Sequence, residues 1–318
     1  MSVRSVLSRP GLRRVRRPLL DAKIWYGLMR SRNKEFIRYA PPGHFYSPIP
    51  DIDHIRSNAG RVFDRSVDDI PGVVLHEEGQ LRLLADFAEH YPEMPFAEHP
   101  SESCRYHLDN PFYSYGDGVV LYSMMRVFRP RRIVEVGSGF SSAAMLEVDD
   151  RFFDGNLELT FIDPYPERLL GLLSEADRTR CAVLRQPVQE VPDDVFTSLE
   201  AGDFLFIDSS HLAKADSDVL HLLFRILPLL RSGVIVHVHD VMWPFEYPSG
   251  WLEQGRAWNE AYFLRAFLQY NEAFSIVYFN SYMAHKHAGA VTEALPLAMC
   301  APSARNTMGN ASLWLRKA

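Results

Sequence analysis

From residue 132 onward, short apolar runs alternate with amphipathic stretches, and this alternation limits the folds open to the chain. The apolar runs are RIVEV (132–136), LELTFI (157–162), CAVLR (181–185), DFLFI (203–207), GVIVHV (233–238), FSIVYF (274–279) and SLWLRK (312–317). Stretches with apolar residues at helical spacing lie between most of them, namely SSAAMLEV, PERLLGLLSEA, KADSDVLHLLFRILPLL and WNEAYFLRAFLQYN. Because strands that alternate with helices form right-handed crossover units, we predict an α/β protein with a doubly wound, mostly parallel sheet of seven strands. Ligands of such sheets bind beyond the carboxyl ends of the strands, where the strand order reverses.

The part of the chain before residue 111 has a different character. Residues 1–20 contain six arginines and no acid, and we predict a flexible basic tail. Contact with an anionic partner and organelle targeting are the alternatives for this tail. Residues 21–110 are predicted to form a helical and irregular accessory region, in which 40–73 are dense in Pro, Gly, Asp and Ser. Residues 111–318 are then the main domain.

Composition narrows the function classes. Without the first twenty residues the net charge changes from −6 to −12 (28 basic and 40 acidic side chains), so we expect no binding of nucleic acid by the main body. No apolar run approaches the roughly eighteen residues of a membrane span. The three cysteines are far apart and form no disulfide framework, which favours a reducing, cytoplasmic location. We expect a small molecule as the partner; the oligomeric state stays open, with a homo-oligomer among the alternatives.

A glycine-rich turn follows the first strand of the alternating region. In VEVGSGFSS, Gly137 and Gly139 lack side chains, which lets a ligand lie against the backbone. Glu135 is placed to accept hydrogen bonds from a cationic ligand. Asp163 ends the next strand, 24 residues after Gly139, where an acid can bind both hydroxyls of a ribose. The alternatives are a tight turn without a ligand, and a helix cap at Asp163.

Ionisable side chains gather after two later strands. Asp208 and His211 follow DFLFI, and His239 and Asp240 follow GVIVHV. Adjacent strand ends would bring the four groups into one cleft, where their clustering is costly unless a cation or a substrate compensates. We interpret His237 as a buried, hydrogen-bonded histidine. The aromatic segment 241–251 (VMWPFEYPSGW) is either a lid over an organic acceptor or a packing surface. Further candidates for ligand contacts are Tyr106, Tyr115 and Asp117.

The series VEVGSGFSS, FIDPYP, GDFLFIDSSH and GVIVHVHDV resembles the motif series of class I S-adenosylmethionine-dependent methyltransferases, over about residues 111–318. Ser141 stands where the commonest pattern of that family has its third glycine. The resemblance implies S-adenosylmethionine as cofactor, with the methionine portion bound by Glu135, Gly137, Ser138 and Gly139. It implies that Asp163 binds the ribose. For the remaining cofactor contacts it implies Pro164, Tyr165, Gln189 and Asp208.

The spacing of D-S-S-H and H-D is similar to that of metal-dependent sugar O-methyltransferases. That resemblance implies a divalent ion such as Mg²⁺ or Mn²⁺ on Asp208, His239 and Asp240, with His211 as the base and Asp208 in the catalytic set. His239 departs from that family, because a carboxylate is expected at its position. In the metal-free alternative, the two aspartates cap helices and bind the cofactor.

We therefore expect O-methylation of a small polar metabolite, such as a sugar or a glycosylated natural product. One alternative is an NAD-linked oxidoreductase, which the missing third glycine disfavours. The other is a non-catalytic methyltransferase-like binding or scaffold protein.

Overall fold

The computed structural model describes residues 26–27, 30, 34–101, 104–304 and 307–318, and its contacts divide the chain into two compact units. The units are Met1–Ala59 and Gly60–Ala318. The predicted basic tail, 1–20, lies outside the described residues. The domain boundaries at residues 20 and 110 stay predictions.

The described part of the first unit consists of short helices and turns. Its elements are α3 (Lys34–Tyr39), α4 (Ile52–Ser57) and the first residue of α5 (Ala59–Val62). Asp51 caps α4, because its side chain accepts hydrogen bonds from the backbone N–H groups of Asp53 (2.9 Å) and His54 (3.2 Å). The segment predicted to be irregular therefore contains two short helices.

The second unit contains a sheet of seven strands and its covering helices. The strands are β1 (Arg132–Val136), β2 (Glu158–Ile162), β3 (Ala182–Leu184), β4 (Phe204–Ile207), β5 (Ile235–Val238), β6 (Phe274–Phe279) and β7 (Leu313–Lys317). The helices are α6 (Glu77–His90), α7 (Tyr115–Phe128), α8 (Phe140–Phe152), α9 (Glu167–Leu172), α10 (Asp177–Arg180), α11 (Asp193–Thr197), α12 (Asp218–His221), α13 (Leu227–Leu229), α14 (Ser249–Glu253), α15 (Glu260–Leu268), α16 (Asn280–Lys286) and α17 (Ala288–Ala294).

The strand order is β3-β2-β1-β4-β5-β7-β6, with β1 to β5 parallel and β7 antiparallel to both of its neighbours. The predicted doubly wound, mostly parallel seven-stranded sheet is confirmed. The chain runs outward from β1 through β2 to β3 and then returns to β4 on the other side of β1. The order therefore reverses between β1 and β4, and the carboxyl ends of these two strands mark the place for a ligand.

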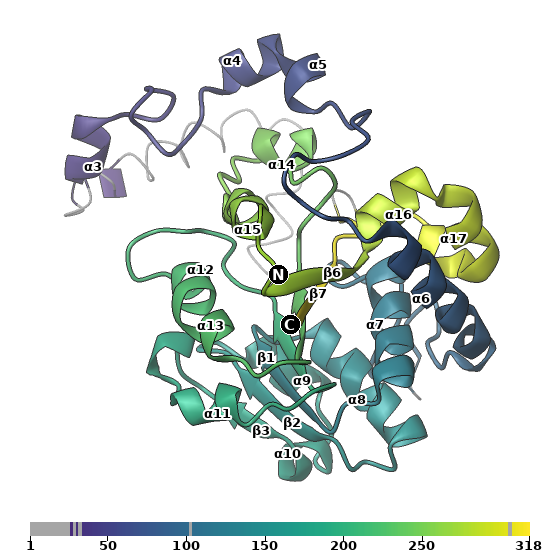
Figure 1. Cartoon of the computed structure of the whole chain (residues 1–318). Coiled ribbons are helices and arrows are strands. Elements are labelled where there is room, and N and C mark those ends of the chain that lie inside the picture. Colours follow the sequence, from purple (N-terminus) through teal and green to yellow (C-terminus); the bar gives the residue numbers. More distant parts are fainter. Residues whose placement is uncertain (1–25, 28–29, 31–33, 102–103, 305–306) are drawn as a thin grey trace, which may run out of the picture. The chain divides into compact units, whose positions relative to one another are not determined.

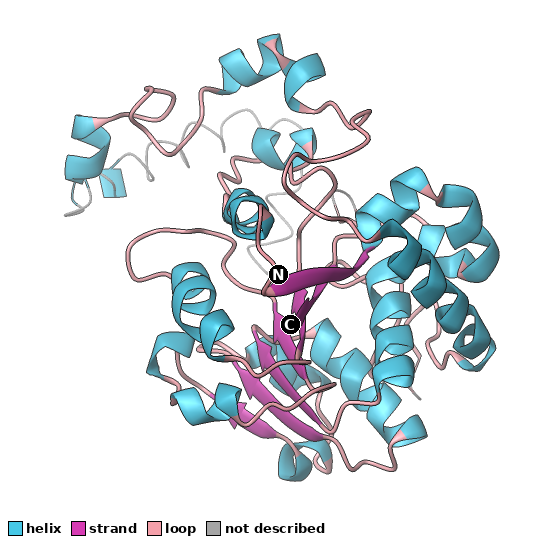
Figure 2. Ribbon diagram, in the orientation of Figure 1, coloured by secondary structure: helices cyan, strands magenta, loops and turns pink. Residues whose placement is uncertain are grey.

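Helices cover both faces of the parallel part of the sheet. In Figure 1, α7 and α8 lie on one side of the strands and α11 to α13 on the other, and Figure 2 shows the strands enclosed between them. Every residue of β4 and β5 is buried, as expected for central parallel strands with both faces covered. This core fixes the strand ends from which the candidate site residues emerge.

Two predicted helices are shorter or interrupted in the structure. The helix predicted over 166–176 ends at Leu172. The helix predicted over 214–230 begins only at Asp218, because the side chain of Ser217 caps it by accepting a hydrogen bond from Leu220 N. A π-helical turn, Leu222–Ile226, then joins α12 to α13.

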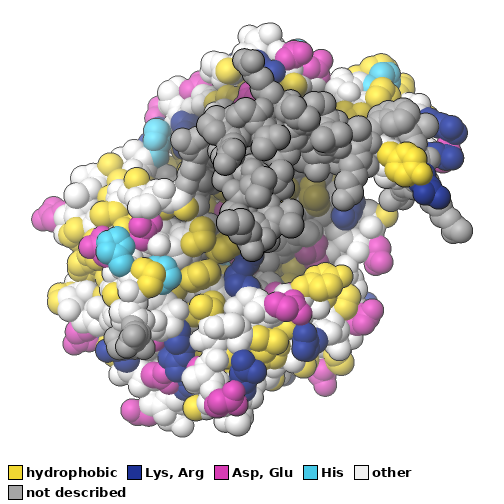
Figure 3. All heavy atoms as spheres, turned by 180° about the vertical axis from the view of Figure 1, so that it is seen from behind, with side chains coloured by type: hydrophobic (Ala, Val, Ile, Leu, Met, Phe, Trp, Pro, Cys, Tyr) yellow, Lys and Arg dark blue, Asp and Glu magenta, His cyan; other side chains and the backbone are white. Residues whose placement is uncertain are grey.

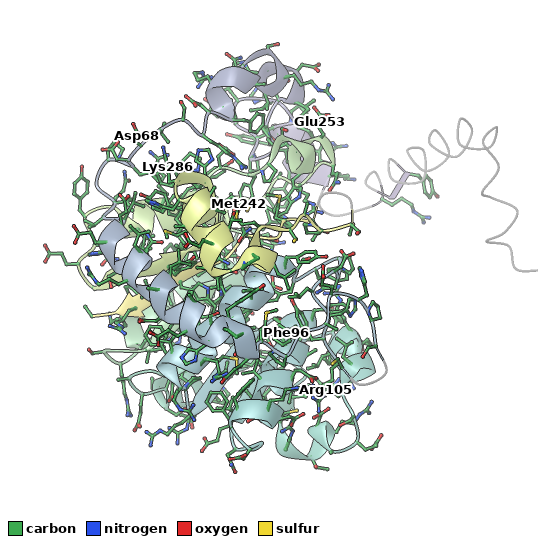
Figure 4. The ribbon with its side chains drawn as sticks, turned by 90° about the vertical axis from the view of Figure 1, so that its right-hand side faces the viewer. Asp68, Phe96, Arg105, Met242, Glu253 and Lys286 are labelled. Carbon is green, nitrogen blue, oxygen red and sulfur yellow. The ribbon has the colours of Figure 1, made fainter. Side chains whose placement is uncertain are left out.

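Charged side chains tie loops to the helices of this unit. The guanidinium of Arg105 lies 2.8 Å from Asp177 of α10 and 2.6 Å from Asp150 of α8. Lys286 of α16 lies 2.8 Å from Asp68, and Figure 4 shows these two side chains next to each other. Both contacts join segments that are distant in sequence.

The surface shown in Figure 3 carries acidic and basic side chains mixed with hydrophobic ones. Among the described residues, no helix combines the length and the apolar character needed to cross a membrane.

We expect Arg105→Ala to lower the free energy of unfolding by about 2 kcal/mol, because the carboxylate of Asp177, 1% exposed, loses one of its two guanidinium partners and keeps only Arg180 at 3.0 Å. Burial alone would raise the pKa of Asp177, but hydrogen bonds from Arg105 and Ser174 lower it to about 2. The contribution is therefore present above about pH 4 and is lost as the pH falls towards 2. Urea unfolding at pH 7 and at pH 3 measures both effects.

The matched control is Arg82→Ala, which removes an exposed pair with Glu78 and should cost less than about 0.5 kcal/mol. Equal losses in the two variants would contradict the anchoring role of Arg105.

Candidate active site

Backbone hydrogen bonds continue the parallel ladder past the carboxyl ends of the strands. These bonds run from Gly137 N to Ile162 O (2.9 Å), from Asp163 N to Leu184 O (3.0 Å), from Asp208 N to Val136 O (2.8 Å) and from His239 N to Ile207 O (2.9 Å). The first residues after four strands are thus held at one edge of the sheet.

Gly137 is required by the contact between two of these loops. Its φ is +82°, and a Cβ there would lie 2.0 Å from the carbonyl oxygen of Asp208. The sequence predicts that a side chain at this position would collide with the ligand. The structure shows that it would first collide with the backbone after β4, so the glycine permits the close approach of the two loops.

Asp163 joins the glycine-rich turn to the loop after β2. Its Oδ2 accepts hydrogen bonds from the N–H (3.1 Å) and the hydroxyl (2.9 Å) of Ser138, and its Oδ1 accepts one from Tyr165 N (2.7 Å). The bond from Tyr165 N closes a turn within the loop after β2, whereas α9 (Glu167–Leu172) has Pro166 at its N-cap position and no side-chain cap, so Asp163 is not the helix cap of the alternative interpretation. The same carboxylate also lines a cavity.

A cavity of about 460 Å³ opens beyond the carboxyl ends of β1, β2 and β4. Six of the predicted site residues line it, namely Gly137, Ser138, Asp163, Pro164, Gln189 and Asp208. Two basic residues that sequence reasoning did not select, Arg168 and Lys214, also line it. Its size and its place at the strand-order reversal suit a small organic ligand.

Three predicted cofactor contacts lie outside this lining. Tyr165 is 79% exposed, and Gly139 is buried at the start of α8. Glu135 is fully buried and accepts hydrogen bonds from the hydroxyls of Ser141 and Ser142. Its carboxylate therefore holds the first turn of α8, and burial raises the pKa of Glu135 to about 8.

His211 is surrounded by three carboxylates. Its Nε2 lies 3.5 Å from Asp208 Oδ1 and 3.5 Å from Asp240 Oδ2, and its Nδ1 lies 2.9 Å from Glu260 Oε2. Burial alone would lower the pKa of His211, but the carboxylates raise it well above its ordinary value. His211 (φ 60°) and Asp240 (φ 58°) both adopt left-handed backbone conformations, which are uncommon for residues other than glycine.

His239 lies on the other side of Asp240. Its Nε2 is 3.6 Å from Asp240 Oδ1, while its Nδ1 is buried and has no hydrogen-bond partner in the described part of the chain. Burial lowers the pKa of His239, but Asp240, Asp208 and Asp117 together raise it above its ordinary value. His237 is buried as predicted, although neither of its ring nitrogens has the expected hydrogen bond.

The predicted metal ligands do not form a coordination site in the described residues. No group of three or more His, Cys, Asp or Glu side chains there is arranged to hold an ion. Asp208 and Asp240 instead face the imidazole of His211 from about equal distances. A histidine therefore lies between the two carboxylates, and the structure does not support the predicted ion on Asp208, His239 and Asp240.

The aromatic segment 241–251 packs into the core. Trp243, Phe245, Tyr247 and Trp251 are at most 3% exposed, which favours the packing interpretation over the lid. Trp258 is half-buried and lies against His211, with ring centroids 4.3 Å apart.

Sequence reasoning missed Glu260, the hydrogen-bond partner of His211. Glu260 is 3% exposed, begins α15 and also accepts a hydrogen bond from the hydroxyl of Ser209 (2.9 Å). The feature of the sequence that could have pointed to Glu260 is an acid within the aromatic stretch WNEAYF. An acid in the first turn of a helix is ordinarily a favourable surface residue, so the sequence alone gave no reason to select it.

Fold and site together define a doubly wound α/β protein with a ligand cavity at the strand-order reversal. A family model described as a methyltransferase domain matches residues 134–241. A protein of Archaeoglobus fulgidus described as uncharacterized is 35% identical over 178 residues, which are 54% of this chain and 78% of that protein. The chain therefore contains a methyltransferase domain over residues 134–241.

Similar solved structures include three with low identity and low TM-scores. The O-methyltransferase TomG of Streptomyces achromogenes is 15% identical, with a TM-score of 0.35 over 70% of this chain and 86% of that one. The methyltransferase PaMTH1 of Podospora anserina is 13% identical, with a TM-score of 0.38 over 84% and 94%. The apo-structure of CmcI-N160 is 16% identical, with a TM-score of 0.39 over 61% and 78%.

We expect Gly137→Ala to destabilise the protein by more than 3 kcal/mol, because the new Cβ would force apart the loops after β1 and β4. Gly255→Ala is the matched control: its φ is +84°, but no atom of the described residues lies within 4 Å of the added Cβ. A positive φ alone costs an alanine roughly 1–2 kcal/mol. Denaturant unfolding compares the two variants, and similar losses would show that the contact with Asp208 contributes little.

Proposed function

We propose that this methyltransferase transfers the methyl group of S-adenosylmethionine to a hydroxyl of a small polar metabolite, such as a sugar or a glycosylated natural product. One observation carries the proposal. A buried imidazole, His211, is held by three carboxylates and lies 3.5 Å from Asp208, which lines the same cavity as Asp163.

The cavity residues supply the contacts that the cofactor needs. Asp163 presents two carboxylate oxygens to the ribose hydroxyls, and the turn at Gly137 and Ser138 presents backbone to the methionine portion. Asp208 places negative charge near the sulfonium. Gln189 lines the same cavity, where its side chain donates to Asp216 O (2.8 Å), and we assign it to the adenine side.

His211 is the proposed base. Glu260 accepts the Nδ1 proton, so in the neutral imidazole Nε2 carries the lone pair. The acceptor oxygen attacks the methyl carbon, the carbon–sulfur bond breaks with its electrons going to sulfur, and the hydroxyl proton passes to Nε2. S-adenosylhomocysteine and a methyl ether are the products. The orientation of the imidazole and the in-line position of the acceptor are what the protein contributes.

No step of this mechanism passes through a metal ion. The two aspartates predicted as ligands face His211, and the described residues hold no three-ligand group. We therefore expect turnover to persist in EDTA. Loss of turnover in EDTA and its recovery with Mg²⁺ or Mn²⁺ would contradict the metal-free mechanism.

Trp258 supports a sugar-like acceptor. Its half-buried ring lies against His211, where an aromatic face can pack on the apolar face of a sugar ring. The methyltransferase domain sets the oxidoreductase alternative aside. Cysteine usage supports a cytoplasmic location, since Cys181 and Cys300 are free thiols.

The function is tested by incubating the protein with methyl-labelled S-adenosylmethionine and a metabolite extract, then identifying the labelled product. We expect the label on oxygen, in an ether. Label on nitrogen or carbon would contradict O-methylation. Binding of the cofactor without any labelled product would favour the scaffold alternative.

We expect Asp163→Ala to weaken S-adenosylmethionine binding by at least about a hundredfold, since it removes two charge-assisted hydrogen bonds worth roughly 1.5–3 kcal/mol each. The control Ser138→Ala removes one donor to this carboxylate but leaves both oxygens for the ribose, so its affinity should change less than about threefold. Calorimetric titration gives both affinities. Unchanged affinity of Asp163→Ala for S-adenosylmethionine would contradict the proposal that Asp163 binds the ribose.

We expect His211→Ala to bind S-adenosylmethionine normally and to lose methyl transfer, because the base is gone while the cavity residues remain. In the wild type the rate should rise with pH above neutrality. The carboxylates raise the pKa of His211, and only the deprotonated imidazole accepts a proton. A rate that is independent of pH from 6 to 9, or an active His211→Ala variant, would exclude His211 as the base.

A further inference from the structure

Near the candidate active site, several buried polar atoms have no hydrogen-bond partner among the residues that the structure describes. They include the hydroxyl of Tyr113, Oδ2 of Asp117 and Nδ1 of His239. The three side chains are at most 3% exposed. Unpaired polar atoms in an interior are costly, and a native protein ordinarily satisfies them with protein groups or with ordered water.

Only one of the two carboxylate oxygens of Asp117 accepts hydrogen bonds from the described residues. Its Oδ1 accepts hydrogen bonds from three donors, namely Ala311 N (2.8 Å), the hydroxyl of Ser312 (2.6 Å) and Asn280 Nδ2 (3.1 Å). Oδ2 has none. These bonds fix the side chain, which has no freedom to turn Oδ2 towards solvent.

Sheet register and ring contacts bring the three side chains together. Val238 pairs with Leu313 in the antiparallel ladder, so the next residues outward, His239 and Ser312, lie side by side. Ser312 bonds Asp117, and the ring of Tyr113 lies 5.0 Å from that of His239. The negative charge of Asp117 raises the pKa of both Tyr113 and His239.

We propose that Tyr113, Asp117 and His239 hold one buried water molecule, and that through it Asp117 is a positioning residue for His239 and Asp240. The chemistry of the three atoms is complementary to water. The water donates to Asp117 Oδ2 and accepts from the Tyr113 hydroxyl and from Nδ1–H of His239, within the two to four bonds usual for buried water. Nε2 of His239 then faces Asp240, which in turn faces His211.

The positioning role rests on the proposed function, because Asp240 matters for turnover only if His211 is the base. A row of groups would then run Asp117, water, His239, Asp240, His211 and Glu260, in which each imidazole lies between acids. Groups that orient the residues in contact with a reaction centre commonly change its activity by ten- to a hundredfold.

A crystal structure that shows ordered waters tests the site directly and needs no activity. We expect density within hydrogen-bonding distance of Tyr113 Oη, Asp117 Oδ2 and His239 Nδ1. A direct bond between Asp117 and His239, or no density there, would overturn the water site. If the water is present but no methyl acceptor is found, the proposed function fails and the site stands.

Kinetics test the positioning role. We expect Asp117→Asn and Tyr113→Phe each to lower kcat about tenfold with less than twofold change in the Kd for S-adenosylmethionine. Because both residues act through one water, the kcat of the double variant should be no lower than that of the less active single variant. A loss of about a hundredfold in the double variant, or unchanged kcat in both single variants, would refute the shared water.

The control for a merely structural effect is Asp149→Asn. Asp149 is also fully buried, bonds Leu157 N and Arg180, and lies near the carboxyl end of α8, away from the cavity. It should lower stability without changing kcat. An equal fall of kcat in this control would show that Asp117 acts only through stability.

Discussion

The site depends on the close approach of the backbones that follow β1 and β4. Asp208 N donates to Val136 O, and Gly137 leaves no Cβ to meet the carbonyl of Asp208. This contact brings the glycine-rich turn and the acid after β4 to the two sides of one cavity. A binding site at a strand-order reversal therefore needs a glycine here for the packing of the protein, before any ligand is considered.

Charge is arranged around that backbone frame. Asp163 accepts hydrogen bonds from Ser138 in the glycine-rich turn, and Asp208 lies at the end of β4. Glu135 accepts hydrogen bonds from the hydroxyls in the first turn of α8. Clustered acids need compensation. The structure supplies it with the imidazoles of His211 and His239, and the sulfonium of the proposed cofactor would add a further positive charge. An acidic cavity is consistent with a cationic cofactor.

Much of the frame could be predicted from the sequence. The apolar runs predicted all seven strands. Because parallel strands end at a common edge, the residues that follow β1, β2, β4 and β5 could be predicted as site residues; they include Gly137, Asp163, Asp208 and Asp240. Glu260 could not be predicted, since its role depends on how α15 packs near the loop after β4. The structure does not support the metal hypothesis, for a related reason: spacing brings Asp208 and Asp240 together, but it does not show that His211 lies between them.

The most direct measurement is a crystal structure of the protein with S-adenosylhomocysteine. We expect the ribose hydroxyls within hydrogen-bonding distance of Asp163 and the sulfur on the side of the cavity where Asp208 adjoins His211. A nucleoside bound elsewhere, or a sulfur remote from His211, would contradict the assignment of this cavity as the site of methyl transfer.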